Sequence, residues 1–337
     1  MPHGLLQKAV EEQVALMRKL RWLNQNLSIS IPVFLVLGLA AGLLFPVQGL
    51  SVLIAPLTLL MVYPMMVGLK PKQLLESGHG SVQFWAMLIN FLVIPFVAFG
   101  LGKVFFADRP ELALGLLLTA LLPTSGMTIS WTGFAKGNVP AAIKLTIVGL
   151  FLGSFLTPFY VHFLLGAELP MKVGLVFKQI LMFVAVPLVA GQLTRGFLIR
   201  RYGQGAFQKD IGPNFPVLST LGVLGIVFVA MALQAKNLMQ SPALVLYIFI
   251  PLLLLYGINY VISTLVARKA MHRGNGIALV YGTVMRNLSI ALALSMTAFG
   301  EAGAQAALLI ALAYIIQVQS AAWYVKLTGR LFPPAQS

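Results

Sequence analysis

The stretch Pro123-Thr124-Ser125-Gly126 interrupts an apolar run, Leu112 to Trp131, that is long enough to cross a bilayer as one helix. Proline lacks an N–H group and clashes with the preceding helical turn, and glycine lowers helix propensity. A membrane helix broken at mid-depth leaves backbone groups that hydrocarbon cannot satisfy, so such a break must be buried in protein or line a polar cavity. The stretch therefore predicts a broken membrane helix.

A second interruption lies near the other end of the chain. Arg286-Asn287-Leu288-Ser289 falls inside the apolar run from Ile277 to Phe299. Two interrupted membrane helices in corresponding places are the best sequence indication of a secondary transporter's binding site. We therefore expect the rest of the chain to be the scaffold for these two breaks.

Composition places the chain among polytopic membrane proteins of the all-α class. Of its 337 residues, 59% are hydrophobic and only 9% are charged. It has no cysteine, which excludes disulfides and thiolate metal sites. The net charge of +15 does not indicate nucleic-acid binding, because the basic residues are spread over loops.

Hydropathy and charge predict the topology. Spans of about 20 residues fit ten times, near 28–46, 50–69, 82–106, 111–135, 139–164, 171–194, 214–234, 243–267, 274–299 and 303–327. With the N-terminus inside, the inner segments hold roughly four times as many Lys and Arg residues as the outer ones. We expect a multi-pass protein of the cell (inner) membrane with both termini cytoplasmic. Residues 1–26 are polar and amphipathic, and they predict either a helix on the cytoplasmic surface or a disordered tail, with no cleavable signal peptide.

The chain also repeats itself. Lys72-Gln73-Leu74-Leu75-Glu76-Ser77 resembles Lys236-Asn237-Leu238-Met239-Gln240-Ser241, and the same shift carries Ser125 to Ser289. This predicts two five-helix repeats, residues 27–165 and 170–330, with chance similarity between apolar segments as the alternative. An odd number of spans inverts the second repeat, so the broken helices run antiparallel and can cross near mid-membrane.

Each break has ion-binding chemistry. The half-helix after a break begins with unpaired N–H groups and a partial positive charge. Thr124 and Ser125 are suitable N-caps for the first such half, and Asn287 and Ser289 for the second. The half-helices before the breaks direct their carbonyl ends nearby, which suits cations. From these features alone, the crossover can hold an anion, a cation or both.

Arg286 is the one charged residue expected near the membrane centre. A guanidinium at this depth costs several kcal/mol on insertion scales and normally faces a cavity or a partner. No Asp or Glu is expected at the same depth. Either the guanidinium binds carbonyls across the crossover, or it contacts an oxyanion or carboxylate as a planar, permanently charged fork.

Other polar residues could line a cavity. Thr128, Trp131, Asn90 and Gln179 are the further candidates; Asn90 and Gln179, like Gln317, can equally form interhelical hydrogen bonds, and Trp131 can equally be a packing residue. We predict no catalytic residue, no metal site and no cofactor, because no buried carboxylate pair, His cluster or metal-ligand set is visible. An intramembrane enzyme or a sensor is only a remote alternative.

These residues resemble the superfamily of bile acid:sodium symporters and arsenite permeases over nearly the whole chain. The run from Pro123 to Val139 is similar to the fourth-span motif of both branches, and Asn287 matches the asparagine of the ninth-span motif. The resemblance implies ten spans, a five-plus-five inverted repeat, and a core domain with two crossed broken helices beside a panel domain. Met61-Val62-Tyr63-Pro64, Trp131 and Ala298-Phe299-Gly300 look closer to the arsenite permease branch.

The departures from both branches bear on function. Thr124 stands where the arsenite permeases have a cysteine, and Ser289 stands where they have a glutamate. The sodium ligands of the symporters, a glutamate, a glutamine and a serine–asparagine pair, correspond by alignment to Gly282, Arg286, Thr128 and Ile129.

We therefore expect a secondary active transporter of a small anion or oxyanion that works by alternating access around the crossover. It would be similar to the arsenite permeases, and export is one direction that this similarity allows. Thr124, Ser125, Arg286, Asn287 and Ser289 would bind the substrate. A proton or no coupling ion is favoured over sodium, and the partners are the substrate and the lipid bilayer. The alternative is a sodium-coupled symporter of organic anions, of the bile-acid type.

Overall fold

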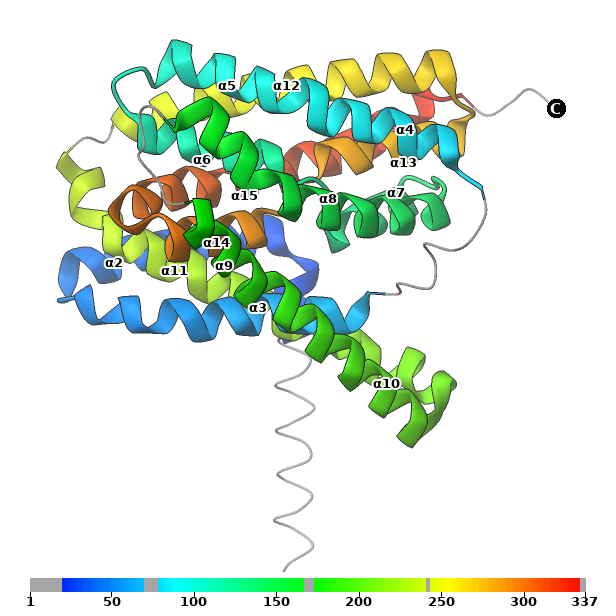
Figure 1. Cartoon of the computed structure of the whole chain (residues 1–337), viewed down its shortest axis with the longest axis horizontal. Coiled ribbons are helices and arrows are strands. Elements are labelled where there is room, and N and C mark those ends of the chain that lie inside the picture. The colour runs from blue at the N-terminus through cyan, green and yellow to red at the C-terminus, as the bar shows by residue number, and fades with distance from the viewer. Residues whose placement is uncertain (1–19, 70–77, 167–172, 241–242, 334–337) are drawn as a thin grey trace, which may run out of the picture.

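The computed structural model describes residues 20–69, 78–166, 173–240 and 243–333 (Figure 1). In these ranges all regular secondary structure is helical, and the only β-type pairing is one isolated bridge. This confirms the prediction of an all-α polytopic chain. Most of the predicted amphipathic segment, residues 1–19, lies outside the described part, so its structure stays a prediction.

One group of helices forms the lower side of the molecule in Figure 1. Helix α11 packs against both α2 and α3, and α10 packs against α3. A Cβ atom on Gly42 of α2 would lie 2.1 Å from the carbonyl oxygen of Ala232 in α11, so only glycine allows this approach. The group comprises α2 (Leu27–Leu44), η1 (Gln48–Leu53), α3 (Ile54–Gly68), α9 (Val173–Ile180), η4 (Leu181–Ala185), α10 (Val186–Ala206), η5 (Phe207–Ile211), η6 (Gly212–Asn214) and α11 (Phe215–Gln240).

The second group holds both interrupted helices. Helix α15 packs against α6 and α14, α12 packs against α13, and α8 packs against α6, α7 and α13. The group comprises α4 (Gly80–Met87), η3 (Leu88–Val93), α5 (Ile94–Phe105), α6 (Pro110–Leu121), α7 (Gly126–Phe134), α8 (Val139–Leu165), α12 (Ala243–Ala270), α13 (Arg273–Val284), α14 (Leu288–Ala298) and α15 (Gly300–Leu331). The two groups meet where α14 lies on α3, α9 and η4, where α15 lies on α2 and α11, and where α8 lies on α9.

The predicted breaks appear at the predicted places. Helix α6 ends at Leu121 and α7 begins at Gly126, while α13 ends at Val284 and α14 begins at Leu288. A third irregularity, the π-helical segment η3, precedes Pro95. Pro95 has no N–H group to donate to the Phe91 carbonyl, and the Tyr160 hydroxyl donates to that carbonyl instead.

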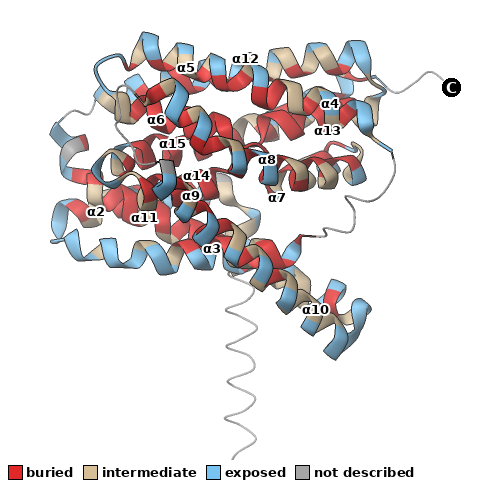
Figure 2. Ribbon diagram, in the orientation of Figure 1, coloured by how far each residue is buried: buried red, intermediate tan, exposed pale blue. Residues whose placement is uncertain are grey.

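Burial matches a protein that lies in a bilayer. All ten residues from Leu112 to Leu121 of α6 are buried, whereas peripheral helices expose large apolar side chains (Figure 2), among them Leu44, Val52, Phe163 and Leu246. Within the described ranges, six helical stretches are long and apolar enough to cross a membrane, and one of them, Gly174–Lys236, has 63 residues. The halves of the broken helices are too short to be counted as spans. The prediction of ten spans and of a five-plus-five repeat therefore stays a prediction.

Candidate functional site

The two breaks lie against each other. The Thr124 N–H donates to the Met285 carbonyl, and the Asn287 N–H donates to the Leu122 carbonyl, both at 2.7 Å. This pattern is an isolated antiparallel bridge that pairs Pro123 with Arg286. Each break thereby satisfies backbone groups that the other leaves free, which hydrocarbon could not do. The prediction that these stretches are adjacent is confirmed.

Helix α8 supports the first break. Thr124 has φ +64°, a left-handed conformation that is costly for a β-branched residue. Its Oγ1 lies 2.6 Å from the Pro123 carbonyl oxygen and 3.2 Å from that of Thr146 on α8. A Cβ atom on Gly149, also on α8, would lie only 2.6 Å from this Oγ1. A glycine on α8 therefore makes room for the strained threonine.

Only one residue of each predicted pair caps its helix. The Ser125 hydroxyl accepts from the Met127 N–H at 3.2 Å, while Thr128 Oγ1 accepts from the Ser125 N–H at 3.1 Å, completing a capping box for α7. Asn287 Oδ1 accepts from the Ile290 N–H at 3.2 Å and caps α14. Thr124 was expected to cap as well.

The other two expected caps have different roles. The prediction that Thr124 caps α7 is wrong. Ser125 is the N-cap of α7, and Thr124 precedes it with a left-handed backbone. The prediction that Ser289 caps α14 is also wrong, because Ser289 lies inside α14. Its hydroxyl forms a hydrogen bond of 2.8 Å with the Tyr314 hydroxyl of α15.

Arg286 lies at the centre of the crossover and is 2% exposed. Its Nη1 donates to Asn90 Oδ1 and to the Ala120 carbonyl, each at 3.0 Å. Its Nη2 is buried and has no hydrogen-bond partner in the described part of the chain. One side of the guanidinium thus binds an oxygen of the first broken helix, as one interpretation of the sequence predicted, and the other side keeps unused donors.

The Gln317 amide holds the backbone of Arg286 from α15. Gln317 Oε1 accepts from the Arg286 N–H at 2.7 Å, and Gln317 Nε2 donates to the Arg286 carbonyl at 3.2 Å. The Tyr256 hydroxyl of α12 donates to the same Oε1 at 2.9 Å. These neutral groups fix the break in place and bring no negative charge to it.

Two further donors at the crossover have no acceptor among the described residues. The Ser125 hydroxyl accepts a hydrogen bond, but its own hydrogen is not donated to any of them. The side-chain nitrogen of Asn287 is in the same situation, because only its Oδ1 is engaged. Both side chains are buried. The crossover therefore offers hydrogen-bond donors in excess of acceptors.

The remaining predicted residues are placed differently. Asn90 lies in η3, binds Arg286, and donates through Nδ2 to the Gly282 carbonyl at 3.0 Å. Thr128 is committed to the capping box, and the half-buried Trp131 packs edge-on against Phe134. Gln179 is half-buried on α9 and forms no hydrogen bond with another described residue. Within the described ranges, no group of three or more His, Asp or Glu residues could hold a metal ion.

Sequence reasoning missed several parts of the site. Tyr256, Tyr314 and Gly149 were not candidates, and Gln317 was only one of several polar residues at depth. The spacing of polar residues was the signal that could have found them. Polar side chains recur every three or four residues on α12 and on α15, so they lie on one face of each helix. Hydrogen bonds join the two faces in three pairs, Tyr256–Gln317, Tyr260–Ser320 and Thr264–Tyr324.

The chain is similar in sequence to several known proteins. The chain is 25% identical to an arsenical-resistance protein Acr3 of Corynebacterium glutamicum over 82% of each chain. It is 28% identical to an uncharacterized sodium-dependent transporter, YocS, of Bacillus subtilis over 55% of this chain and 56% of that one. An Acr3 of Alkaliphilus metalliredigens is 23% identical over 68% of this chain and 70% of its own.

One family model matches a stretch of the chain that includes parts of both helix groups. It matches residues 55–241, which is more than half of the chain and includes the first break, α11 and all that lies between them. The family is one of symporters, and the relatives named above are a sodium-dependent transporter and arsenical-resistance proteins, so the chain is a membrane transport protein rather than an enzyme. On this match, the chain belongs to the Sodium Bile acid symporter family.

Proposed function

We propose that this chain is a secondary active transporter of a small anion or oxyanion and that the crossover is its substrate site. Thr124, Ser125, Arg286, Asn287 and Ser289 would form that site. The observation that carries the proposal is the buried guanidinium of Arg286, which forms no ion pair with a described residue and whose Nη2 has no hydrogen-bond partner among them.

The charges around Arg286 favour an anion. Helices α7 and α14 both begin at the crossover, and each brings the partial positive charge of a helix N-terminus. A buried charge without a counter-charge is strongly unfavourable. An anion that accepts from Nη2 and from the donors of Ser125 and Asn287 would compensate this excess of positive charge. A charge-assisted hydrogen bond of this kind contributes about 1.5–3 kcal/mol net.

The helix groups provide a route for alternating access. The crossover belongs to the group of α4–α8 and α12–α15, which contacts the group of α2, α3, α9, α10 and α11 along α8, α14 and α15. We propose that movement between these groups exposes the crossover to one side of the membrane and then to the other. We also propose that both chain termini are cytoplasmic, on the basis of the charge distribution.

A proton or no coupling ion fits the crossover better than sodium. Arg286 brings a permanent positive charge that would repel a sodium ion. At Gly282, another position that corresponds to a sodium ligand of the symporters, an added Cβ would lie 2.5 Å from Leu145 Cδ1. The second candidate, a sodium-coupled organic anion symporter, is favoured by the family description and by the name of the Bacillus relative.

A thermal-shift panel on the purified protein tests the proposal. The panel contains arsenite, arsenate, phosphate, sulfate and acetate, with acetamide as a neutral control, each with sodium or potassium and across pH. A ligand present at 100 times its Kd stabilises the folded state by about 2.7 kcal/mol. We expect at least one anion to raise the melting temperature without sodium. Equal effects of acetate and acetamide, with no oxyanion active, would refute the proposal, and a shift that requires sodium would favour the second candidate.

A further inference from the structure

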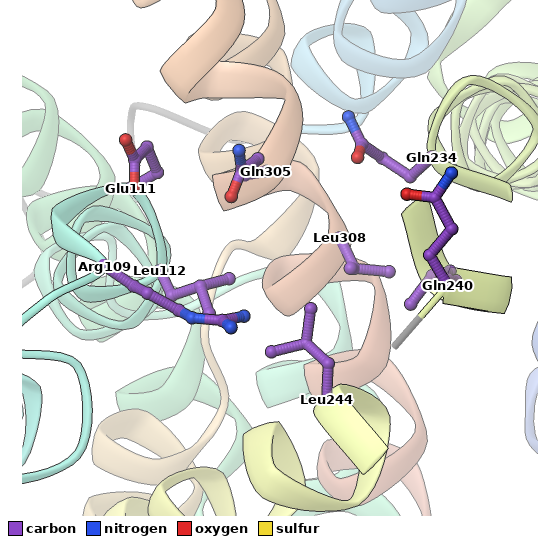
Figure 3. Close-up of a pocket in the computed structure, with 9 residues that line it drawn as sticks. Arg109, Glu111, Leu112, Gln234, Gln240, Leu244, Gln305 and Leu308 are labelled. Carbon is purple, nitrogen blue, oxygen red and sulfur yellow. The ribbon is translucent and has the colours of Figure 1, made fainter. Parts of the chain in front are cut away.

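A pocket of about 430 Å³ lies away from the crossover, at the other end of α6 (Figure 3). Its walls come from the start of α6, the end of α11, the first turn of α12, and α15. Its volume falls in the range of about 300–1,000 Å³ that is typical of small-molecule sites. The lining residues are Arg109, Glu111, Leu112, Gln234, Leu238, Gln240, Leu244, Gln305 and Leu308.

The pocket has leucines on its floor and a polar rim that contributes the larger share of its surface. Leu112, Leu238 and Leu308 line the floor and are buried, so each presents a small aliphatic area, while Arg109 and Gln305 are exposed. Figure 3 shows the Arg109 guanidinium reaching into the pocket and the Glu111 carboxylate pointing away from that guanidinium. Arg109 forms no ion pair with any described residue, so its charge is available to a ligand.

The pocket is distinct from the crossover. Along α6, Leu112 in the pocket and Ala120 at Arg286 are separated by a rise of roughly 12 Å. Along α15, Leu308 in the pocket and Gln317 at the crossover are separated by roughly 14 Å. Two helices thus give similar separations, and one small ligand cannot contact both places.

We propose that this pocket is a second binding site, for a small organic carboxylate with an apolar body. The carboxylate would pair with the planar fork of Arg109, and the apolar body would lie on the leucine floor. An inorganic oxyanion would leave that floor uncovered. A neutral molecule would leave the guanidinium unpaired, and a simple cation would be repelled by it.

The bound carboxylate would connect the two helix groups. Gln234, Leu238 and Gln240 come from α11, whereas the other lining residues come from α6, α12 and α15 and from Arg109 just before α6. Occupancy therefore favours the arrangement in which these helices surround the pocket. By the charge distribution this end of α6 faces outside, so the site would sense organic anions on the outer side.

Calorimetric titration of the full-length purified protein with benzoate tests this site, with benzamide as the neutral probe of the same shape. We expect Arg109→Gln to weaken benzoate binding about tenfold, equivalent to about 1.4 kcal/mol. Lys236→Gln is the matched control, because Lys236 is exposed on α11 and does not line the pocket. Gln305→Trp, at an exposed position on α15, should block binding by filling the pocket while Arg109 stays intact.

The same titrations separate this site from the crossover. The part of benzoate binding that Arg109→Gln weakens should persist in Arg286→Gln, whatever Arg286→Gln does to anion binding at the crossover. Equal binding of benzoate and benzamide, equal losses in the Arg109 and Lys236 variants, or loss of the Arg109-dependent component in the Arg286 variant would each overturn the proposal. None of these outcomes decides whether Arg286 binds the transported anion.

Discussion

Replacing Arg286 by Gln removes the buried charge and the unpartnered Nη2 from the crossover. In the native protein Nη1 donates two hydrogen bonds of 3.0 Å, to Asn90 and to the Ala120 carbonyl. Hydrogen bonds from a charged group contribute about 1.5–3 kcal/mol each, and a neutral amide could restore one at about 0.5–1.5 kcal/mol. The loss is opposed by relief of a desolvation penalty of several kcal/mol. We therefore expect the variant to fold with a similar melting temperature.

The anion affinity of this variant should fall much more than its stability. Loss of one charge-assisted hydrogen bond to the anion, about 1.5–3 kcal/mol, corresponds to roughly a tenfold to hundredfold increase in Kd. Arg286→Lys should recover only part of the affinity, because an ammonium group cannot make a planar two-point contact.

Melting temperature and anion binding must be measured on the same preparations. The probe is the anion that stabilises the native protein most in the thermal-shift panel. If Arg286 only holds the crossover together, the Gln variant will melt far lower and its surviving folded fraction will bind the anion normally. Unchanged affinity in a well-folded Gln variant would refute the reasoning and remove Arg286 from the site.

Three further predictions follow from the crossover and from the charge pattern. Transport and thermal stability should show no saturable dependence on sodium in the millimolar range when potassium is the control, and such a dependence would show that a sodium site exists. Gly149→Ala should destabilise the protein by about 1–3 kcal/mol, because its Cβ would lie 2.6 Å from Thr124 Oγ1. Gly257→Ala is the control, because an added Cβ there would meet no atom within 4 Å. Equal melting temperatures of the two variants would contradict the account of α8. Because the native chain has no cysteine, an impermeant maleimide should label Lys236→Cys in intact cells and Lys269→Cys only after lysis, and the reverse pattern would invert the topology.

The positions of both breaks could be predicted because local chemistry determines them. Pro123 and Gly126 in one apolar run, and Arg286 with Asn287 in another, cannot continue a lipid-exposed helix. The meeting of the breaks followed from the inverted repeat that the chain suggests, and the bridge between Pro123 and Arg286 confirms that they are adjacent.

The individual contacts could not be predicted, because they depend on helices distant in sequence. Thr124 takes a left-handed conformation only because Gly149 of α8 leaves room for it. Ser289 faces Tyr314 rather than a helix end. Arg286 finds Asn90, 196 residues away, in a π-helical segment that no local pattern indicated. The pocket at Arg109 likewise could not be predicted, because its lining comes from four separate helices, α6, α11, α12 and α15.

The most direct test of the central claim is to locate a bound anion at the crossover. A crystal structure of the complex with a selenium- or bromine-containing form of the preferred anion would show its position by anomalous scattering. Our account predicts a peak within hydrogen-bonding distance of Arg286 Nη2 and close to Ser125 and Asn287. A bound anion located elsewhere, with Arg286 Nη2 still without a partner, would contradict it.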